Sequence, residues 1–526
     1  MTSNLTSFIE ETTRQASALE KSYNLAEWNA ATEGTPEAIE AQAKAQTAYM
    51  RFWSDPERFR RAKALAKSAA PSDALLARQI RLIYLTAGMN QQDESTLEQI
   101  AQVEAEVRQR YFNFRARVDG RTLNDNQIDE RLATTTDASE ARQVWEGSKQ
   151  VGAEVADRVR ELARLRNRAA QTHGFRDHFH RSLTLSEIEE PQLLTLFDDL
   201  ERRSRRPFEQ VKARIDATRS QRYGVPVEEL RPWHYSDRFF QKPDQLGEVD
   251  FDGLFSAHDP SALATVTYDG LGMDVRPILA RSDLYAREGK NQHAFCTHID
   301  RQGDIRTLNN LERNHRWTET LHHELGHAVY EVYIDSSLPW LLRAPAHILS
   351  TEAIAILMGS LTLEEEWLAR VLGVPPAEAA PVAAAARERE RASRLVFTRW
   401  CLVMTHFERG LYADPESDLD GLWWDLVERY QLVRRPEGRR APDWAAKIHV
   451  ALHPVYYHNY ELGTLVMAQL RAALQQAAGG LVGRPAAGAW LKEHVFRPGA
   501  TMDWAAHVAH ATGEPLNPRY FIESLT

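Results

Sequence analysis

The segment Glu319-Thr-Leu-His-His-Glu-Leu-Gly-His327 lies in the central part of the 526-residue chain and contains an H-E-x-x-H motif. Residues four apart lie on one face of an α-helix, so this spacing directs the imidazoles of His323 and His327 to a common point. Zinc accepts nitrogen ligands of this kind at about 2.0–2.1 Å. The segment therefore predicts a helix that supplies two ligands to a zinc ion.

A catalytic zinc site needs a third protein ligand and keeps one position open. Glu352 follows the motif and begins an otherwise apolar run, residues 353–358. Because a buried carboxylate is costly unless it is paired or binds a metal, we predict that Glu352 is the third ligand. The alternatives are a first-turn glutamate that interacts with the helix dipole, and two surface histidines on a solvated helix.

Two further glutamates accompany the predicted ligands. Glu324 lies beside the metal without binding it, where it can take a proton from the hydrolytic water. Glu319 lies one turn before His323, and a carboxylate there can orient the ligating imidazole; a solvated helix glutamate is the alternative. The sequence thus predicts one Zn²⁺ per chain with Glu324 as the general base.

Composition excludes several other classes of protein. Hydrophobic residues make up 43% and charged residues 26% of the chain, its formal net charge is −10, and no basic stripe is visible, so we expect no nucleic-acid binding. No window of 18 uncharged apolar residues predicts a membrane span. Two distant cysteines provide no disulfide framework, and residues 1–20 lack the apolar region of a signal peptide. We therefore expect a cytoplasmic protein without a membrane partner.

Helical periodicity dominates the chain. The strongest helical patterns cover residues 35–70, 93–118, 136–171 and 187–220. The best strand candidates are residues 264–268 and 292–308, the second interrupted by a turn at 302–304. We expect a mostly helical, all-α fold with a small β element near the site. No Pro/Ser-rich linker divides the chain, which favours a single catalytic domain over residues 1–526.

Several segments outside the motif occur in a characteristic order. They are FIEETTRQASALEKSYNLAEWNAAT (8–32), VWEGSKQVG (144–152), GLWWDLVERYQL (421–432) and KIHVALHPVYYHNY (447–460). Together with LHHELGHAVYEVYIDSSLPWLLRAPAHILSTEAIA (321–355), they resemble the angiotensin-converting-enzyme family of zinc peptidyl-dipeptidases. The ETLHHELGH run is closer to the thimet oligopeptidase family, which shares the fold.

The resemblance implies a fold and an activity. The fold would be a two-lobed ellipsoid with a deep central channel that admits unfolded oligopeptides. Residues 1–130 would include possible lid helices, residues 294–360 the zinc-site core, and residues 440–470 the segment that binds substrate and the transition state. The activity would be zinc-dependent hydrolysis of peptide bonds in oligopeptides, with release of C-terminal dipeptides.

The resemblance also implies roles for individual residues. Lys447 would bind the terminal carboxylate of the substrate, His449 would bind the peptide backbone, and Tyr460 would donate a hydrogen bond to the developing oxyanion. The other implied substrate-binding residues are Tyr457, with Tyr456 as its competitor, and His298. The glutamine that assists carboxylate binding in the dipeptidases is not identifiable from the sequence.

Two further expectations concern chloride and the alternative functions. Asn459 stands where chloride-dependent members carry an arginine, so we expect little activation by chloride. The alternatives are an oligoendopeptidase or a metallocarboxypeptidase on the same fold, or a non-catalytic zinc-binding scaffold. Glu324 argues against the scaffold because a structural zinc site does not need a glutamate that is not a ligand.

Overall fold

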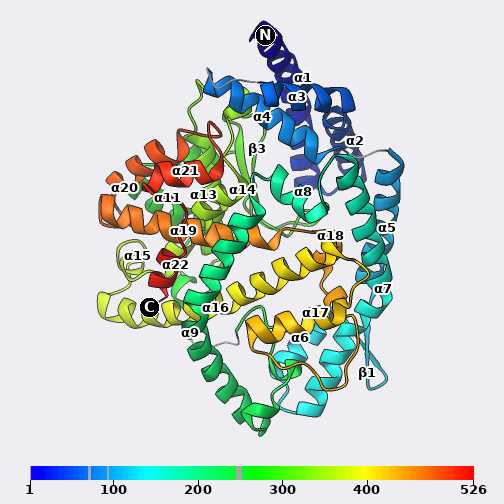
Figure 1. Cartoon of the computed structure of the whole chain (residues 1–526). Coiled ribbons are helices and arrows are strands. Elements are labelled where there is room, and N and C mark those ends of the chain that lie inside the picture. The colour runs from blue at the N-terminus through cyan, green and yellow to red at the C-terminus, as the bar shows by residue number, and fades with distance from the viewer. Residues whose placement is uncertain (1, 69–72, 92–93, 244–250, 526) are drawn as a thin grey trace. The chain divides into compact units, whose positions relative to one another are not determined.

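The computed structural model describes residues 2–68, 73–91, 94–243 and 251–525, and helices dominate this part of the chain (Figure 1). The sheets within it are two antiparallel hairpins. One pairs β1 (Ala116–Val118) with β2 (Arg121–Leu123), and the other pairs β3 (Phe295–His298) with β4 (Ile305–Leu308). The expected mostly all-α fold with a small β element is therefore confirmed.

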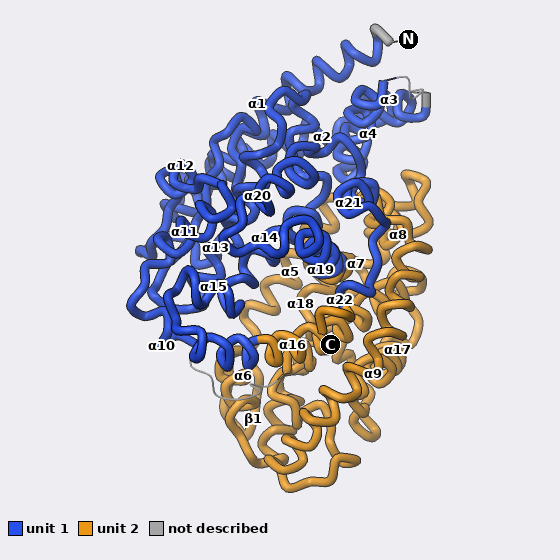
Figure 2. The backbone as a smooth tube through the Cα atoms, turned by 90° about the vertical axis from the view of Figure 1, so that its left-hand side faces the viewer, with its two compact units in different colours: residues 1–91, 249–386, 462–521 blue, residues 92–248, 387–461, 522–526 orange. Residues whose placement is uncertain are grey.

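The chain forms two compact units, each assembled from separate stretches of sequence (Figure 2). Unit 1 comprises residues 1–91, 249–386 and 462–521, and unit 2 comprises residues 92–248, 387–461 and 522–526. The H-E-x-x-H motif and Glu352 lie in unit 1, whereas Lys447 and Tyr460 lie in unit 2. The single catalytic domain, its lid and its channel remain predictions.

Four helices form the N-terminal part of unit 1, namely α1 (Thr2–Glu33), α2 (Pro36–Trp53), α3 (Pro56–Ser68) and α4 (Ala74–Met89). Helix α2 is capped at its start by Thr35, whose side chain accepts a hydrogen bond from the backbone N–H of Ala38 at 3.2 Å. The helix predicted over residues 35–70 is interrupted before Pro56, which begins α3, and residues 69–70 lie outside the described residues. Phe8, Trp53 and Ile83 belong to the core between these helices.

The middle of unit 1 carries the predicted metal ligands on α13 (His315–Val332) and α14 (Ile348–Gly359), which pack against each other. Helix α13 also contacts β3, β4 and α11 (Pro260–Gly270). The remaining helices of this unit are α10 (Asp252–Phe255), α12 (Arg276–Leu279), α15 (Glu365–Arg370), α20 (Pro485–Leu491) and α21 (Trp504–Thr512).

The strand predicted over residues 264–268 is wrong, because these residues lie inside α11. Their β-branched side chains favoured a strand. In the helix, the hydroxyl groups of Thr265 and Thr267 donate to the carbonyl oxygens of Ser261 and Leu263, at 2.8 and 2.9 Å. These local hydrogen bonds satisfy both threonines within a helical backbone.

Unit 2 is built around α7 (Ala138–Thr172), whose buried face includes Val144, Val155 and Val159 as the periodicity predicts. Its other helices within the unit are α5 (Glu94–Asn113), α6 (Asp125–Thr134), α8 (His178–Leu185), α9 (Glu190–Tyr223), α17 (Leu419–Leu426) and α18 (Ile448–Leu452). Helices α16 (Pro376–Ala413), α19 (Tyr457–Ala478) and α22 (Arg519–Ser524) contribute residues to both units. Among the described helices, none is long and apolar enough to cross a membrane.

Candidate metal centre

His323, His327 and Glu352 come together in unit 1, with one potential ligand atom of each lying within 4.8 Å of the others. The Nε2 atoms of the two histidines lie 3.8 and 3.9 Å from the carboxylate oxygens of Glu352. The imidazole rings are 5.0 Å apart and nearly perpendicular, at 83°. Two imidazole nitrogens and one carboxylate around a common point form the ligand set of a catalytic zinc site.

The glycine of the motif allows α14 to approach α13. A Cβ atom at Gly326 would lie 2.8 Å from the Cα of Ala355 and 3.2 Å from the carbonyl oxygen of Ile354. Such contacts are too short for any side chain, so only glycine permits this approach. Glu352 lies about one turn before Ala355 on α14, so the close approach brings its carboxylate to the two histidines.

His327 is oriented by a residue that sequence reasoning missed. Its Nδ1 atom lies 2.7 Å from the hydroxyl oxygen of Thr351, which directly precedes the third ligand on α14. When Nδ1–H donates to this hydroxyl, Nε2 carries the lone pair that a metal requires. A threonine within a buried helix next to a predicted ligand was the available signal in the sequence.

The predicted orienting role of Glu319 stays a prediction. Its side chain is exposed, as expected for the alternative of a solvated helix glutamate. Its Cγ and the Cβ of His323 would each lie 3.5 Å from a Cβ atom at Gly359, the last residue of α14. Glu319 thus lies beside the first ligand, at the point where α13 meets the end of α14.

The neighbouring His322 belongs to the core. Its Nδ1 lies 2.7 Å from the carbonyl oxygen of Thr318, and its Nε2 lies 3.0 Å from the hydroxyl of Thr267. Burial lowers the pKa of His322 to about 4, which keeps the ring neutral. The two adjacent histidines therefore point to different faces of α13, and only His323 is available to a metal.

Burial also controls the protonation of the ligands. It lowers the pKa of His323 to about 4, and burial together with His323 lowers the pKa of His327 to about 3. Both imidazoles are consequently neutral, the form that binds a metal. Burial, and next the charge of Glu352, raise the pKa of Glu324 to about 8. A bound cation would oppose this rise because it favours the carboxylate.

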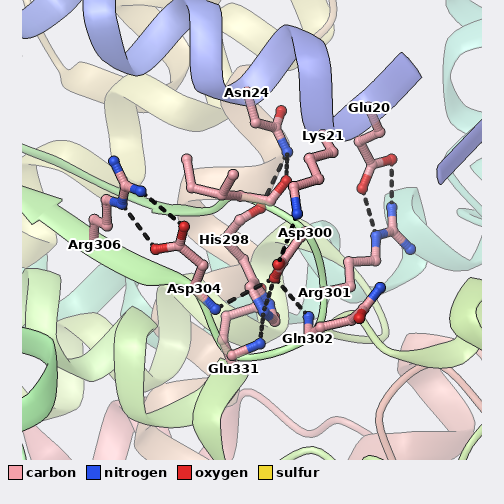
Figure 3. A network of polar contacts seen from close by, with 12 residues as sticks. Glu20, Lys21, Asn24, His298, Asp300, Arg301, Gln302, Asp304, Arg306 and Glu331 are labelled. Atoms are coloured by element: carbon pink, nitrogen blue, oxygen red, sulfur yellow. Dashed lines mark hydrogen bonds and ion pairs between the residues drawn. The ribbon is translucent and has the colours of Figure 1, made fainter. Parts of the chain in front are cut away.

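His298 fastens the β3–β4 hairpin to α13 (Figure 3). Its Nδ1 lies 3.0 Å from a carboxylate oxygen of Glu331, one turn beyond His327, and its Nε2 accepts the backbone N–H of Gly303 at 3.0 Å. Both ring nitrogens are therefore engaged within unit 1. The predicted contact between His298 and substrate stays a prediction, and it would require one of these bonds to open.

The tip of the same hairpin is tied to α1. Arg301 forms a bidentate ion pair with Glu20, at 2.6 and 2.9 Å, and its guanidinium stacks on Trp340 at 4.4 Å from the ring centroid. The side chain of Asn24 donates to the carbonyl oxygen of His298 at 3.0 Å. Figure 3 shows this network, which connects α1 through the hairpin to the helix that carries both histidines.

Lys447 is buried in unit 2 beside a glutamine that sequence reasoning did not find. Its Nζ donates to the side-chain oxygen of Gln241 at 2.9 Å and lies 5.4 Å from the ring centroids of Phe239 and Trp400. No carboxylate of the described residues forms an ion pair with Nζ, and burial lowers the pKa of Lys447 to about 8. Gln241 lies in a segment with no recognisable motif, so only the fold reveals its proximity.

The remaining predicted residues form an aromatic cluster in unit 2. The His449 ring lies 5.2 Å from the Tyr457 ring, which lies 5.5 Å from the Tyr460 ring, and Tyr456 lies 5.1 Å from Tyr460. Burial, and next the charge of Lys447, lower the pKa of His449 to about 4. Tyr457 is only 4% exposed, whereas Tyr460 is 39% exposed. Tyr460 is therefore the more exposed of these two residues.

Comparisons with known proteins give two family matches. The family model described as angiotensin-converting enzyme matches residues 1–226, and the model of peptidase family M3 matches residues 279–526, which include all the predicted site residues. The comparison with curated proteins gives no match. Both families consist of zinc metallopeptidases, so the resemblance inferred from the sequence is confirmed. The chain is a metallopeptidase that acts on peptides.

Proposed function

We propose that this metallopeptidase releases dipeptides from the free C-terminus of oligopeptides. The observation that supports the proposal is the environment of Lys447, a buried ammonium group that forms no ion pair with a carboxylate within the described part of unit 2. A buried charge of this kind is costly unless it is neutralised. The terminal carboxylate of a peptide would neutralise it. The Gln241 amide nitrogen donates one N–H to Asp237 Oδ2 at 3.4 Å, and its second N–H could donate to the same terminal carboxylate.

The residues of the metal centre would perform the hydrolysis. Zinc held by His323, His327 and Glu352 would polarise the scissile carbonyl and acidify the attacking water. Glu324 would accept a proton from this water and later deliver it to the leaving amine. Glu324 suits this task because it lies next to a ligand in the motif and is itself 7% exposed.

Residues of unit 2 would hold the peptide and the developing negative charge. Tyr460 would donate its hydroxyl proton in a hydrogen bond to the oxyanion, a preorganised contact that favours the transition state. His449 is neutral, and its Nδ1 is buried without a hydrogen-bond partner in the described residues, so it could bind a peptide group. The proposal requires that these residues and the metal centre act on the same substrate.

The match to peptidase family M3 supports a second candidate, because it covers the metal centre. An oligopeptidase of that kind would cut within peptides and would not depend on a free C-terminus. Lys447 would then have a structural role, and its substitution would affect blocked and unblocked peptides equally.

The test uses a library of short peptides, each prepared with a free and with an amidated C-terminus. The zinc-loaded protein and its Glu324→Gln variant are incubated with both sets, and the products are identified by mass spectrometry. We expect C-terminal dipeptides from free peptides, slower cleavage of amidated peptides, and no products from the variant. Glu493→Gln, at an exposed glutamate, serves as the matched control.

Internal cleavage that is equally fast on both sets would contradict the dipeptidase proposal and support the oligopeptidase. Release of single C-terminal residues would indicate a carboxypeptidase. Cleavage that persists in Glu324→Gln would contradict the role of Glu324 as the general base. A protein that binds zinc but cleaves neither set would contradict the proposed activity altogether.

A further inference from the structure

Residues 237–241 form a tight loop that presents Gln241 to Lys447. The carboxylate of Asp237 accepts hydrogen bonds from the backbone N–H groups of Phe239 and Gln241, at 2.9 and 3.1 Å. Phe240 has a φ of +50°, a left-handed conformation that is rare for a bulky residue. Such a conformation persists only where the surroundings hold it, so the contacts of this loop require an explanation.

Three consecutive carbonyl groups of the loop accept hydrogen bonds from buried side chains. The carbonyl oxygen of Arg238 accepts from Trp145 Nε1 at 3.0 Å and from Lys149 Nζ at 2.8 Å. The side-chain amide of Gln431 donates to the carbonyl oxygens of Phe239 and Phe240, at 3.0 and 2.8 Å. Trp145, Lys149 and Gln431 thus bind the backbone carbonyl groups of residues 238–240 and hold the loop in place.

Lys149 is an unusual choice for a purely structural contact. It is 4% exposed, and no described carboxylate forms an ion pair with it. Burial lowers its pKa well below the usual value for lysine. An apolar side chain of similar size would fill the same space without the cost of burying an amine. Its Nζ contacts the Arg238 carbonyl and the Phe239 ring of the loop, whose centroid lies 3.3 Å away, and also lies 5.1 Å from the Trp145 ring centroid.

The Phe239 ring lies between Lys149 and Lys447, the residue proposed to bind the substrate carboxylate. Its centroid lies 3.3 Å from Lys149 Nζ and 5.4 Å from Lys447 Nζ, so a movement of the ring would alter the surroundings of both amines. The cavity bordered by Lys149, Phe239 and Gln431 measures about 20 Å³, enough for one water molecule. The loop therefore has little room to shift while these contacts are intact.

We propose that Lys149, Trp145 and Gln431 are positioning residues that set the preference for a free C-terminal carboxylate by fixing residues 237–241 against Lys447. The inference rests on the proposed function, because it assigns the carboxylate to Lys447 and Gln241. The three residues act through the loop and do not contact substrate themselves. A preference for free over amidated peptides consequently depends on residues behind the binding pair.

The experiment measures kcat and KM for one peptide with a free and with an amidated C-terminus. Lys149→Met retains the length of the side chain and removes one of the two hydrogen bonds to the Arg238 carbonyl. A neutral hydrogen bond contributes about 0.5–1.5 kcal/mol, so we expect KM for the free peptide to rise roughly two- to tenfold. We expect kcat, and both constants for the amidated peptide, to stay unchanged.

Three further variants complete the experiment. Gln431→Met removes the hydrogen bonds to the carbonyl oxygens of Phe239 and Phe240 and should produce the same selective rise in KM. Lys447→Met removes the ammonium group itself and should abolish the preference. Arg158→Met is the matched control on α7, because Arg158 pairs with glutamates at the surface and should behave as wild type. Thermal unfolding of each variant identifies a loss of fold, and Trp145→Phe replaces any variant that does not fold.

The outcomes separate this inference from the proposed function. If Lys447→Met loses the preference while Lys149→Met and Gln431→Met retain it, the positioning role is wrong and the proposed function stands. If the wild-type protein cleaves both peptides equally, carboxylate recognition fails and the inference fails with it. Equal losses on both peptides in Lys149→Met would indicate a general structural role and would also overturn the inference.

Discussion

Gly326 of α13 and Ala355 of α14 lie so close that a Cβ atom at position 326 would be 2.8 Å from the Cα of Ala355. The neighbouring atom is backbone, so rotation of a side chain cannot relieve the contact. The two helices carry all three predicted metal ligands, and this contact therefore links helix packing to the geometry of the metal centre.

Gly326→Ala should move α14 away from α13 and displace Glu352. Overpacking of this kind costs roughly 1–3 kcal/mol of the free energy of unfolding. We also expect zinc affinity to fall at least about tenfold, because outer contacts of a metal site have effects of this size. Chemical denaturation and competition with a chelator measure the two quantities.

Gly359→Ala is the control for this substitution. A Cβ at position 359 would meet its nearest atoms at 3.4–3.5 Å, which is ordinary van der Waals contact, and we expect nearly wild-type zinc affinity. Equal affinities in Gly326→Ala and the wild type would show that the close approach does not determine the position of Glu352.

Thr351→Val should weaken zinc binding without disturbing the ligands themselves. Valine has nearly the shape of threonine but lacks the hydroxyl that lies 2.7 Å from His327 Nδ1 in the wild type, so this nitrogen loses its partner. Loss of such an orienting contact typically lowers metal affinity about 10- to 100-fold. Thr351→Ser retains the hydroxyl and should retain most of the affinity. Similar zinc dissociation constants for the valine and serine variants would contradict this role.

The pH dependence of kcat/KM should differ between free and amidated peptides. Burial lowers the pKa of Lys447 to about 8, so its ammonium form predominates below this pH and is lost above it. Because the ammonium form binds a carboxylate, kcat/KM for the free peptide should fall as the pH rises through about 8. The ratio of the two kcat/KM values isolates this effect from other titrations, and Lys447→Met should make the ratio independent of pH.

The sequence predicts the metal ligands because their spacing is local. His323 and His327 lie four residues apart on one helix, and Glu352 stands out as a carboxylate before an apolar run. Thr351 and Gln241 carry no such pattern, since their partners are distant in sequence and only tertiary packing joins them. The error at residues 264–268 has the opposite origin, because β-branched side chains suggested a strand where the helix satisfies their hydroxyls.

The hairpin contact also explains why His298 could not be assigned from sequence. A histidine near a zinc motif resembles a substrate ligand, but the backbone N–H of Gly303 and the carboxylate of Glu331 occupy its two nitrogens. Neither partner is evident from sequence spacing. The resemblance identifies the residue, and its observed contacts within unit 1 are structural.

Glu331→Leu should release the hairpin from α13. The substitution removes the carboxylate that accepts from His298 Nδ1 at 3.0 Å, a charge-assisted hydrogen bond of roughly 1.5–3 kcal/mol. The ring then has no anchor on α13, and the Gly303 N–H bond to Nε2 should weaken with it. We expect faster hydrogen exchange at residues 298–304, measured by mass spectrometry, with zinc affinity unchanged.

Glu331→Gln keeps an acceptor oxygen for Nδ1–H and should retain most of the protection. If the leucine variant exchanges as slowly as the glutamine variant, the contacts of the hairpin tip with α1 suffice to hold it, and His298 is not required for its position.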